Sequence, residues 1–97
     1  MTPAPAPQGS SASRSGTTRA RNERIAGSAR RHHFAHDAPV PFLCECSDPT
    51  CVELVRVTLQ QYSDARGHAD FVTAPGHQVD GAKVVRVRDS YWLYRAE

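Results

Sequence analysis

The sequence predicts a small α+β domain with short antiparallel strands, one short helix and a C-terminal β-hairpin, preceded by a disordered basic N-terminal arm. Residues 1–20 contain no Val, Ile, Leu or aromatic side chain. From Val40 onward, short β-branched and aromatic runs alternate with turn residues, which is typical of strands. We therefore place the arm at residues 1–39 and a single folded domain at residues 40–97.

The beginning of the chain lacks the composition of a packed structure. Residues 1–20 are rich in Pro, Gly, Ser and Thr, so they have no apolar surface to offset the entropy lost on ordering the backbone. Residues 22–34 have the composition of a frayed helix, with Asn22 as a candidate N-cap and Gly27 weakening the interior. We expect this part of the arm to be ordered only by a partner.

The arm is also strongly basic. Residues 1–36 carry six Arg against Glu23, a net charge of +5, whereas the remaining residues carry six basic and nine acidic side chains, a net charge of −3. A basic arm on an acidic body is suited to binding nucleic acid or an acidic protein surface, although such arginines can also simply keep a disordered segment in solution. The candidates for this contact are Arg19, Arg21, Arg24, Arg30 and Arg31.

The domain begins with two strands and a helix. Residues 42–43 and 52–57 have the composition of strands. Thr58-Leu59-Gln60-Gln61 then matches a capping box, in which the first and last side chains each bond to the other's backbone amide. The pattern predicts a helix over residues 59–66, with Gly67 as its C′ residue.

A short strand and a turn follow. Residues 71–73 predict the strand, and Pro75-Gly76 suit the two central positions of a type II turn. Such a turn would hold the next residue, His77, in a defined orientation.

The chain closes with a predicted β-hairpin. Residues 84–88 and 91–95 are two strands joined by Asp89-Ser90. We expect Trp92 to lie in the core, because a small domain with a single Trp needs that side chain inside.

All three cysteines lie in one run, Cys44-Glu45-Cys46-Ser47-Asp48-Pro49-Thr50-Cys51. Closely spaced thiolates around a tight turn are ligands that Zn²⁺ prefers, and a domain of about 60 residues gains stability from a metal cross-link. Zinc needs a fourth ligand, for which we favour His77 over His68. The remaining alternatives are an N-terminal histidine or no metal, and the N-terminal candidates are His32, His33 and His36.

A site with three cysteines and one histidine has no open position for water, which indicates a structural zinc ion. Glu45 stands between two of the predicted ligands. We expect it to be a solvated turn residue or to support the ligands through hydrogen bonds.

The cysteine run resembles the post-SET zinc motif of histone lysine methyltransferases, whose C-x-C-x4-C loop takes a further ligand from elsewhere. This local resemblance implies ligand geometry and no activity. A broader pattern resembles a family of small bacterial proteins of unknown function, which share an FLCEC…C…APGH sequence. It implies that the cysteines pair with His77, and it brings no known reaction. The matching pieces are residues 41–46, Cys51, residues 59–62 and residues 71–77.

The sequence contains no phosphate-binding glycine loop, no Ser/His/Asp order and no paired carboxylates, so we expect no enzymatic activity. We expect a zinc-stabilised interaction protein, regulatory or transcription-associated, whose arm contacts nucleic acid or an acidic partner. One alternative is a protein-binding adaptor that uses the folded module, and another is a zinc or thiol redox enzyme. With no apolar membrane span, no secretory signal and no evident small-molecule substrate, we expect a cytoplasmic protein.

Overall fold

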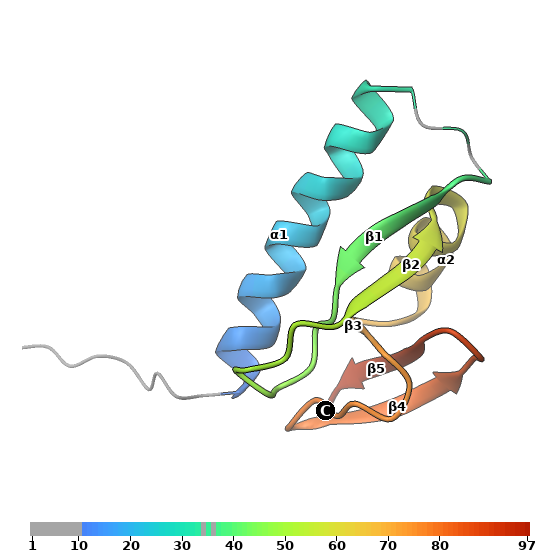
Figure 1. The fold of residues 1–97 in the computed structure, drawn as a ribbon. Coiled ribbons are helices and arrows are strands. Elements are labelled where there is room, and N and C mark those ends of the chain that lie inside the picture. Colours follow the sequence, from blue (N-terminus) through green and yellow to red (C-terminus); the bar gives the residue numbers. More distant parts are fainter. Residues whose placement is uncertain (1–10, 34, 36) are drawn as a thin grey trace, which may run out of the picture.

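The structure, a computed structural model, describes residues 11–33, 35 and 37–97. These residues form helices and antiparallel strands arranged in two sheets (Figure 1), which confirms the predicted α+β class. The elements are α1 (Ser11–Arg31), β1 (Pro39–Leu43), β2 (Leu54–Thr58), α2 (Leu59–His68), β3 (Phe71–Thr73), β4 (Ala82–Val87) and β5 (Trp92–Ala96).

Strands β1 and β2 form a two-stranded antiparallel sheet that is buried on one side. Val40 pairs with Val57 and Phe42 with Val55, and all four side chains are buried, whereas their neighbours along each strand are exposed or half-buried. The Phe42 ring stacks on Tyr62 of α2, with 4.2 Å between centroids and 5° between the planes. This alternation places the core between the sheet and α2.

Helix α2 begins as the sequence predicts. The Gln61 amide donates to the Thr58 hydroxyl (3.0 Å) and the Thr58 amide donates to the Gln61 side chain (2.9 Å), which confirms the capping box. The end of the helix is different, because Gly67 lies inside α2 and the C-cap is Ala69. Ala69 is buried and its amide donates to the Ala65 carbonyl (2.9 Å). The helix therefore continues past Gly67 and ends where the chain enters the core.

Strands β3, β5 and β4 form the second sheet in that order, and β4 and β5 confirm the C-terminal hairpin. Leu93 and Tyr94 are the buried residues of β5, whereas Trp92 is only half-buried. The expectation that Trp92 lies in the core is therefore wrong. Tyr94, two residues further along β5, takes the interior position, where its hydroxyl donates to the His77 carbonyl (2.6 Å).

Helix α1 corrects the prediction of a disordered arm. The prediction is wrong for residues 11–31, which form a continuous helix. Residues 22–31 of the predicted frayed helix form its second half, and residues 32–33 form a turn. Residues 1–10, 34 and 36 lie outside the described residues. The helix lies along β1 (Figure 1) and also contacts α2. Its buried side chains are small or polar, so they give no apolar periodicity. Its buried residues are Ser15, Thr18, Asn22, Ala26 and Ala29.

An ion pair holds α1 to α2. Arg66 Nε donates to Glu23 Oε2 (2.9 Å), and the Tyr62 hydroxyl donates to the same oxygen. Burial alone would raise the pKa of Glu23, but the hydrogen bonds from Tyr62 and Arg66 lower it below its usual value. Glu23 is therefore a carboxylate at neutral pH and holds α1 in place through charge-assisted bonds.

Within the described part of the chain, neither helix combines the length and the apolar character that crossing a membrane requires.

Candidate metal centre

The structure brings the three cysteines and His77 together. The cysteines lie on the loop between β1 and β2, and His77 lies on the loop between β3 and β4. One ligand atom from each of the four side chains falls within 4.8 Å of all the others. The His77 Nδ1 atom is 3.5 Å from the Sγ of Cys44 and 3.5 Å from the Sγ of Cys51. These four residues can hold a metal ion.

The observed spacing fits tetrahedral coordination. With metal–sulfur bonds of about 2.3 Å and metal–nitrogen bonds of about 2.0 Å, a tetrahedral site separates sulfur from nitrogen by about 3.6 Å. The two distances from His77 Nδ1 agree with this value. The three cysteines are free thiols rather than disulfide partners, so all of their sulfur atoms are available as ligands.

The cysteine loop is shaped by Asp48. Its Oδ1 atom accepts hydrogen bonds from the Thr50 amide (2.9 Å) and the Thr50 hydroxyl (2.8 Å), and the Cys51 amide donates to the Asp48 carbonyl (3.1 Å). The bonds from Thr50 lower the pKa of Asp48, which keeps it a charged acceptor. This turn returns Cys51 to the same point as Cys44 and Cys46.

The predicted turn that presents His77 is present. The His77 amide donates to the Ala74 carbonyl (3.1 Å), and Gly76 has φ of +82°, which a type II turn requires at that position. The Ala74 amide donates to the Cys44 sulfur (3.2 Å). The same turn therefore positions the histidine and supplies a hydrogen bond to one of the thiol ligands.

Backbone hydrogen bonds hold the two loops together. The Glu45 amide donates to the Val72 carbonyl (2.9 Å), and the Ser47 amide donates to the Gln78 carbonyl (2.9 Å). The cysteine loop thereby follows the edge of β3 and the segment after His77. The four candidate ligands are brought together by this pairing as well as by their own turns.

Glu45 is fully buried, which contradicts the expectation of a solvated turn residue and agrees with a supporting role. Its carboxylate accepts hydrogen bonds from both terminal nitrogens of Arg66, from the Val72 amide (2.9 Å) and from the Asn22 side chain (2.6 Å). Arg66 and Asn22 were not predicted as parts of the site. No local pattern indicates them, because they lie more than 20 residues from Glu45 in the sequence.

Helix α1 also reaches the cysteine loop directly. Arg14 Nη1 donates to the Cys46 carbonyl (2.5 Å) and its Nη2 donates to the Cys51 carbonyl (3.3 Å). The Asn22 amide group and the Leu43 backbone bond to each other in both directions, at 2.8 Å each. Asn22 is therefore an interior contact of α1 and not the predicted N-cap.

The arginines proposed from the sequence separate into two groups. Arg19 lies 3.7 Å from Asp70, and Arg30 donates to the Ser63 hydroxyl (3.3 Å), so both face other parts of the fold. Arg21, Arg24 and Arg31 are exposed, and their spacing places them on one side of α1.

The other histidine candidates are not at the site. His68 is exposed at the end of α2, and His32 and His33 are exposed after the last turns of α1. His36 lies outside the described residues.

Two of the three thiols, those of Cys44 and Cys46, lack the lowered pKa of a reactive cysteine. Burial raises the pKa of Cys44 to about 12, and burial likewise raises the pKa of Cys46. A reactive cysteine requires a lowered pKa, so these thiols are poor nucleophiles at neutral pH. As metal ligands they would give up their protons when the ion binds.

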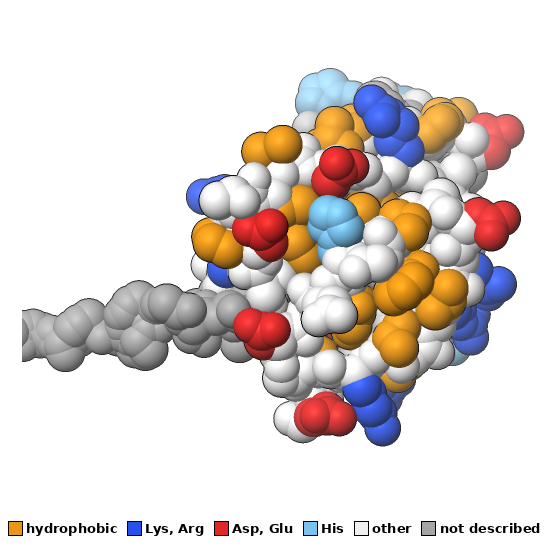
Figure 2. All heavy atoms as spheres, turned by 60° about the horizontal axis from the view of Figure 1, so that its bottom comes forward, with side chains coloured by type: hydrophobic (Ala, Val, Ile, Leu, Met, Phe, Trp, Pro, Cys, Tyr) orange, Lys and Arg blue, Asp and Glu red, His pale blue; other side chains and the backbone are white. Residues whose placement is uncertain are grey.

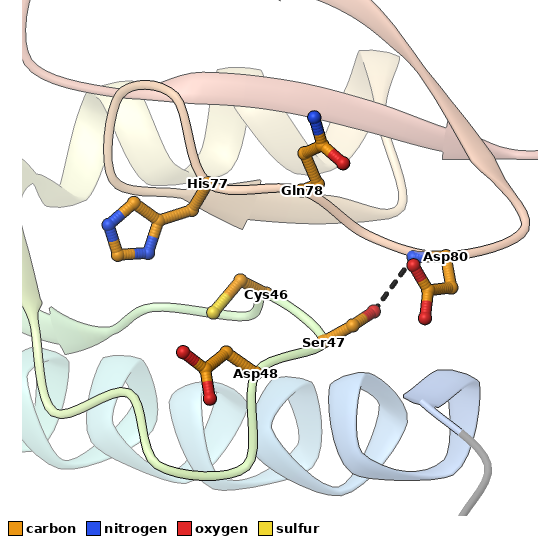
Figure 3. Close-up of a pocket in the computed structure, with 6 residues that line it drawn as sticks. All are labelled: Cys46, Ser47, Asp48, His77, Gln78 and Asp80. Atoms are coloured by element: carbon orange, nitrogen blue, oxygen red, sulfur yellow. Dashed lines mark hydrogen bonds between the residues drawn. The ribbon is translucent and has the colours of Figure 1, made fainter.

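A pocket of about 400 Å³ opens beside the cluster. Figure 3 shows the His77 ring and the Cys46 side chain on the two facing loops, and the Asp80 amide donating to the Ser47 hydroxyl (2.7 Å). The pocket gives solvent access to one side of the site. Its lining residues are Cys46, Ser47, Asp48, His77, Gln78 and Asp80.

Comparison with protein-family models, with curated proteins and with solved structures finds no match to this chain. The cluster of Cys44, Cys46, Cys51 and His77, which can hold a metal ion, is the feature of the described structure that points most directly to a function.

Proposed function

We propose that the protein is a zinc-stabilised interaction protein in which Cys44, Cys46, Cys51 and His77 hold one structural Zn²⁺. The observation that carries the proposal is the convergence of these four side chains from two separate loops to within 4.8 Å. Three thiolates and one imidazole are soft and borderline ligands, which favour zinc over magnesium or calcium. The four protein ligands would complete a tetrahedral site, so the ion would have a structural role.

The position of the site explains what zinc would stabilise. The cysteine loop belongs to the sheet of β1 and β2, and His77 belongs to the loop that joins two strands of the other sheet. Arg14 of α1 bonds to two carbonyls of the same cysteine loop. Zinc would therefore cross-link both sheets and fix the loop on which α1 docks. This cross-link would add to the stability of a domain whose core is small.

Native mass spectrometry of the purified protein tests this proposal. We expect one zinc ion per chain in the parent, and loss of the ion, or its release at lower chelator concentration, in His77→Ala. His68→Ala is the matched control, because His68 is exposed and outside the cluster, and it should bind zinc like the parent. A parent without metal, or a His77→Ala variant that holds zinc equally tightly, would overturn the proposed site.

We further propose that α1 supplies the interaction surface, through the exposed Arg21, Arg24 and Arg31. Three guanidinium groups on one side of a rigid helix can pair with successive phosphates of nucleic acid or with an acidic protein surface. Docking by Asn22 and Glu23 holds the helix so that this side faces outward. The proposal retains three of the five arginines expected from the sequence.

The salt dependence of binding to a 20-base-pair DNA duplex tests the surface. The slope of log K against log salt is negative, and each lost phosphate contact reduces its magnitude by about 0.9. A variant with Arg21, Arg24 and Arg31 changed to Gln should therefore show a slope smaller in magnitude by about 2 to 3. The control changes Arg56, Arg86 and Arg88 to Gln, which removes equal charge elsewhere, and should retain the slope. Equal losses in both variants, or no binding by the parent, would contradict a DNA-binding role for α1.

The raised pKa of the buried Cys44 thiol weighs against the alternative of a thiol redox enzyme. The alternative of an adaptor is favoured by a different observation, the exposed edge of β4, which is a separate surface.

A further inference from the structure

Strand β4 presents an open, apolar sheet edge. It comes last in the order β3-β5-β4, and among the described residues no strand pairs with its outer side. Val84, Val85 and Val87 are 43%, 41% and 58% exposed. Figure 2 shows hydrophobic side chains gathered on this side of the molecule, with Lys and Arg at the margin. Such an edge is a template for a further strand.

Because of a β-bulge in β4, the charged side chains Lys83 and Arg86 lie on the same face of the hairpin. Lys83 pairs with Arg95 and Arg86 pairs with Leu93, and the register shifts between Val84 and Arg86. Paired residues share a face, and residues two apart along β5 also share a face. Lys83 and Arg86 therefore lie on the same face although they are three residues apart, because the bulge adds one residue between them.

The opposite face of the hairpin is apolar. Val84 pairs with Tyr94 and Val87 pairs with Trp92, which places all four side chains on the face away from Lys83 and Arg86. A strand added beside β4 would continue this division. Its apolar side chains would meet one face of the edge and its charged side chains would meet the cations on the other.

The edge of β1 is closed to such addition. Pro39 and Pro41 have no N–H group to donate, and the register puts them at alternate positions with Leu43. The N–H and C=O groups of Leu43 both bond to the Asn22 side chain, at 2.8 Å each. The outward N–H groups of β1 are therefore missing at the two prolines and already paired at Leu43, so β1 offers no free donor to an added strand.

The edge of β3 is closed by Glu45. Its backbone amide donates to the Val72 carbonyl (2.9 Å), and its carboxylate accepts from the Val72 amide (2.9 Å). The cysteine loop thus satisfies the outward groups of β3. Within the three-stranded sheet, the edge that remains open in the described structure is that of β4.

We propose that the β4 edge binds an extended acidic segment of a partner protein, in which Glu or Asp alternates with apolar residues, as an added strand. Its apolar side chains lie against Val84 and Val87, and its carboxylates lie against Lys83 and Arg86. Main-chain hydrogen bonds to β4 supply affinity, and the alternation of the segment supplies specificity.

The charges of the edge favour this partner over two others. A second copy of β4 would bring Lys83 and Arg86 of each chain together, and the like charges would repel. Single-stranded nucleic acid needs aromatic and basic groups on one surface. Among the aromatic residues of the hairpin, Tyr91 lies beside Arg86 and Arg88 but is half-buried. Trp92 lies on the face opposite the cations and Tyr94 is buried, so the hairpin has no continuous stacking surface beside its cations.

Fluorescence anisotropy with a labelled probe peptide tests the proposal on the full zinc-loaded chain. The probe is the heptapeptide Glu-Val-Glu-Val-Glu-Val-Glu with an amidated C-terminus. The control peptide has the same composition in two blocks, four Glu followed by three Val. We expect the alternating peptide to bind at least tenfold more tightly. Equal binding of the two peptides would overturn recognition of the alternating pattern.

Two further peptides test main-chain pairing. One carries N-methyl groups on its three Val residues and the other on three of its Glu residues, so each lacks donors along one edge of the strand. A strand paired with β4 uses one of these edges, so one peptide should bind at least tenfold more weakly and the other should bind like the parent peptide. Unchanged binding of both would exclude strand addition.

Charge reversal at the edge tests the cationic face. The variant Lys83→Glu with Arg86→Glu should lose at least tenfold in affinity for the acidic peptide, and it should bind the corresponding Lys-Val peptide. The matched control, Arg30→Glu with Arg56→Glu, makes the same change in net charge at exposed positions outside both proposed surfaces and should stay within twofold of the parent. Equal losses in both variants would show that binding follows net charge alone and would overturn the proposal.

Amide NMR spectra locate the bound peptide. Perturbations should concentrate on β4 and on the facing residues of β5. Three outcomes would overturn the proposal. Perturbations on α1 would show that the peptide binds there, and displacement of the peptide by oligothymidine would show that the edge binds nucleic acid. A dimer of the free protein that dissociates in Val87→Lys would show that the edge binds a second copy of the chain.

Discussion

At the scale of single residues, Glu45 makes hydrogen bonds and an ion pair that no sequence motif indicates. It stands between two candidate ligands, its carboxylate completes the edge of β3 at Val72, and it pairs with Arg66. Its side chain is fully buried and that of Arg66 is 13% exposed. A buried ion pair of this kind depends on both partners, because removal of one leaves the other charge without compensation.

We predict that Glu45→Gln lowers the free energy of unfolding of the zinc-loaded protein by about 3 kcal/mol. This value is near the lower end of the cost of breaking a buried ion pair, because Arg66 retains its bond to Glu23. Urea denaturation of parent and variant measures the difference in the free energy of unfolding. Glu53→Gln is the control, because Glu53 is an exposed acid on the same loop and should change stability by less than about 0.5 kcal/mol. Equal stability of Glu45→Gln and the parent would show that the ion pair contributes nothing net.

The cluster of candidate metal ligands could be predicted from the sequence, whereas the residues that support it could not. Cys44, Cys46 and Cys51 are close in the sequence, and the Pro-Gly turn before His77 is a local signal. Asn22 and Arg66 reach Glu45 only through the folding of α1 and α2. Contacts between segments that are distant in the sequence cannot be predicted from the spacing of residues in a single sequence.

At the scale of elements, α1 shows why apolar patterning failed. The side of the helix that packs on the fold contains Ser15, Thr18 and Asn22 as well as two alanines, so it has no stripe of large apolar residues. The Asn22 side chain bonds to the Leu43 backbone instead. The strands and the start of α2 were predictable because β-branched runs and a capping box are local features. The end of α2 was misplaced because the local signal of Gly67 was misleading, since the helix continues to His68 and ends before the buried Ala69.

Gly16 offers a test of whether α1 contributes to stability. It lies in the helix interior, and a Cβ atom added there would meet nothing within 4 Å. We predict that Gly16→Ala stabilises the zinc-loaded protein by about 0.5 to 1 kcal/mol, because alanine loses less entropy in a helix. Denaturant midpoints measure the change.

The same substitution in the turn provides the contrast. Gly76 also has free space around it, but its φ of +82° is unfavourable for alanine. Gly76→Ala should therefore destabilise the protein by about 1 kcal/mol or more. A Gly16→Ala variant no more stable than the parent would mean that the first half of α1 is not part of the cooperative fold.

At the scale of the whole molecule, the candidate metal centre is where the two sheets meet. The two sheets share no strand, and the cysteine loop and the His77 loop connect them through backbone bonds and the four candidate ligands. This arrangement was not predictable, because the sequence does not show how strands divide between sheets. The α+β class was predictable, because it depends only on the presence of the elements.

The two proposed surfaces lie on different elements, since the exposed arginines belong to α1 and the open edge belongs to β4 (Figure 1). Either can therefore fail its test without the other. Both depend on the same core, so zinc loading is the first measurement to make.

The position of Trp92 makes the hairpin visible to spectroscopy. The chain has one Trp, and this residue is half-buried in β5 directly opposite the exposed Val87. All indole emission therefore originates beside the β4 edge. A ligand that covers this edge would remove water from the indole and move the emission to shorter wavelength, and one bound only to the outer side of α1 would leave the spectrum unchanged. The protein thus carries its own optical reporter for one of its two surfaces.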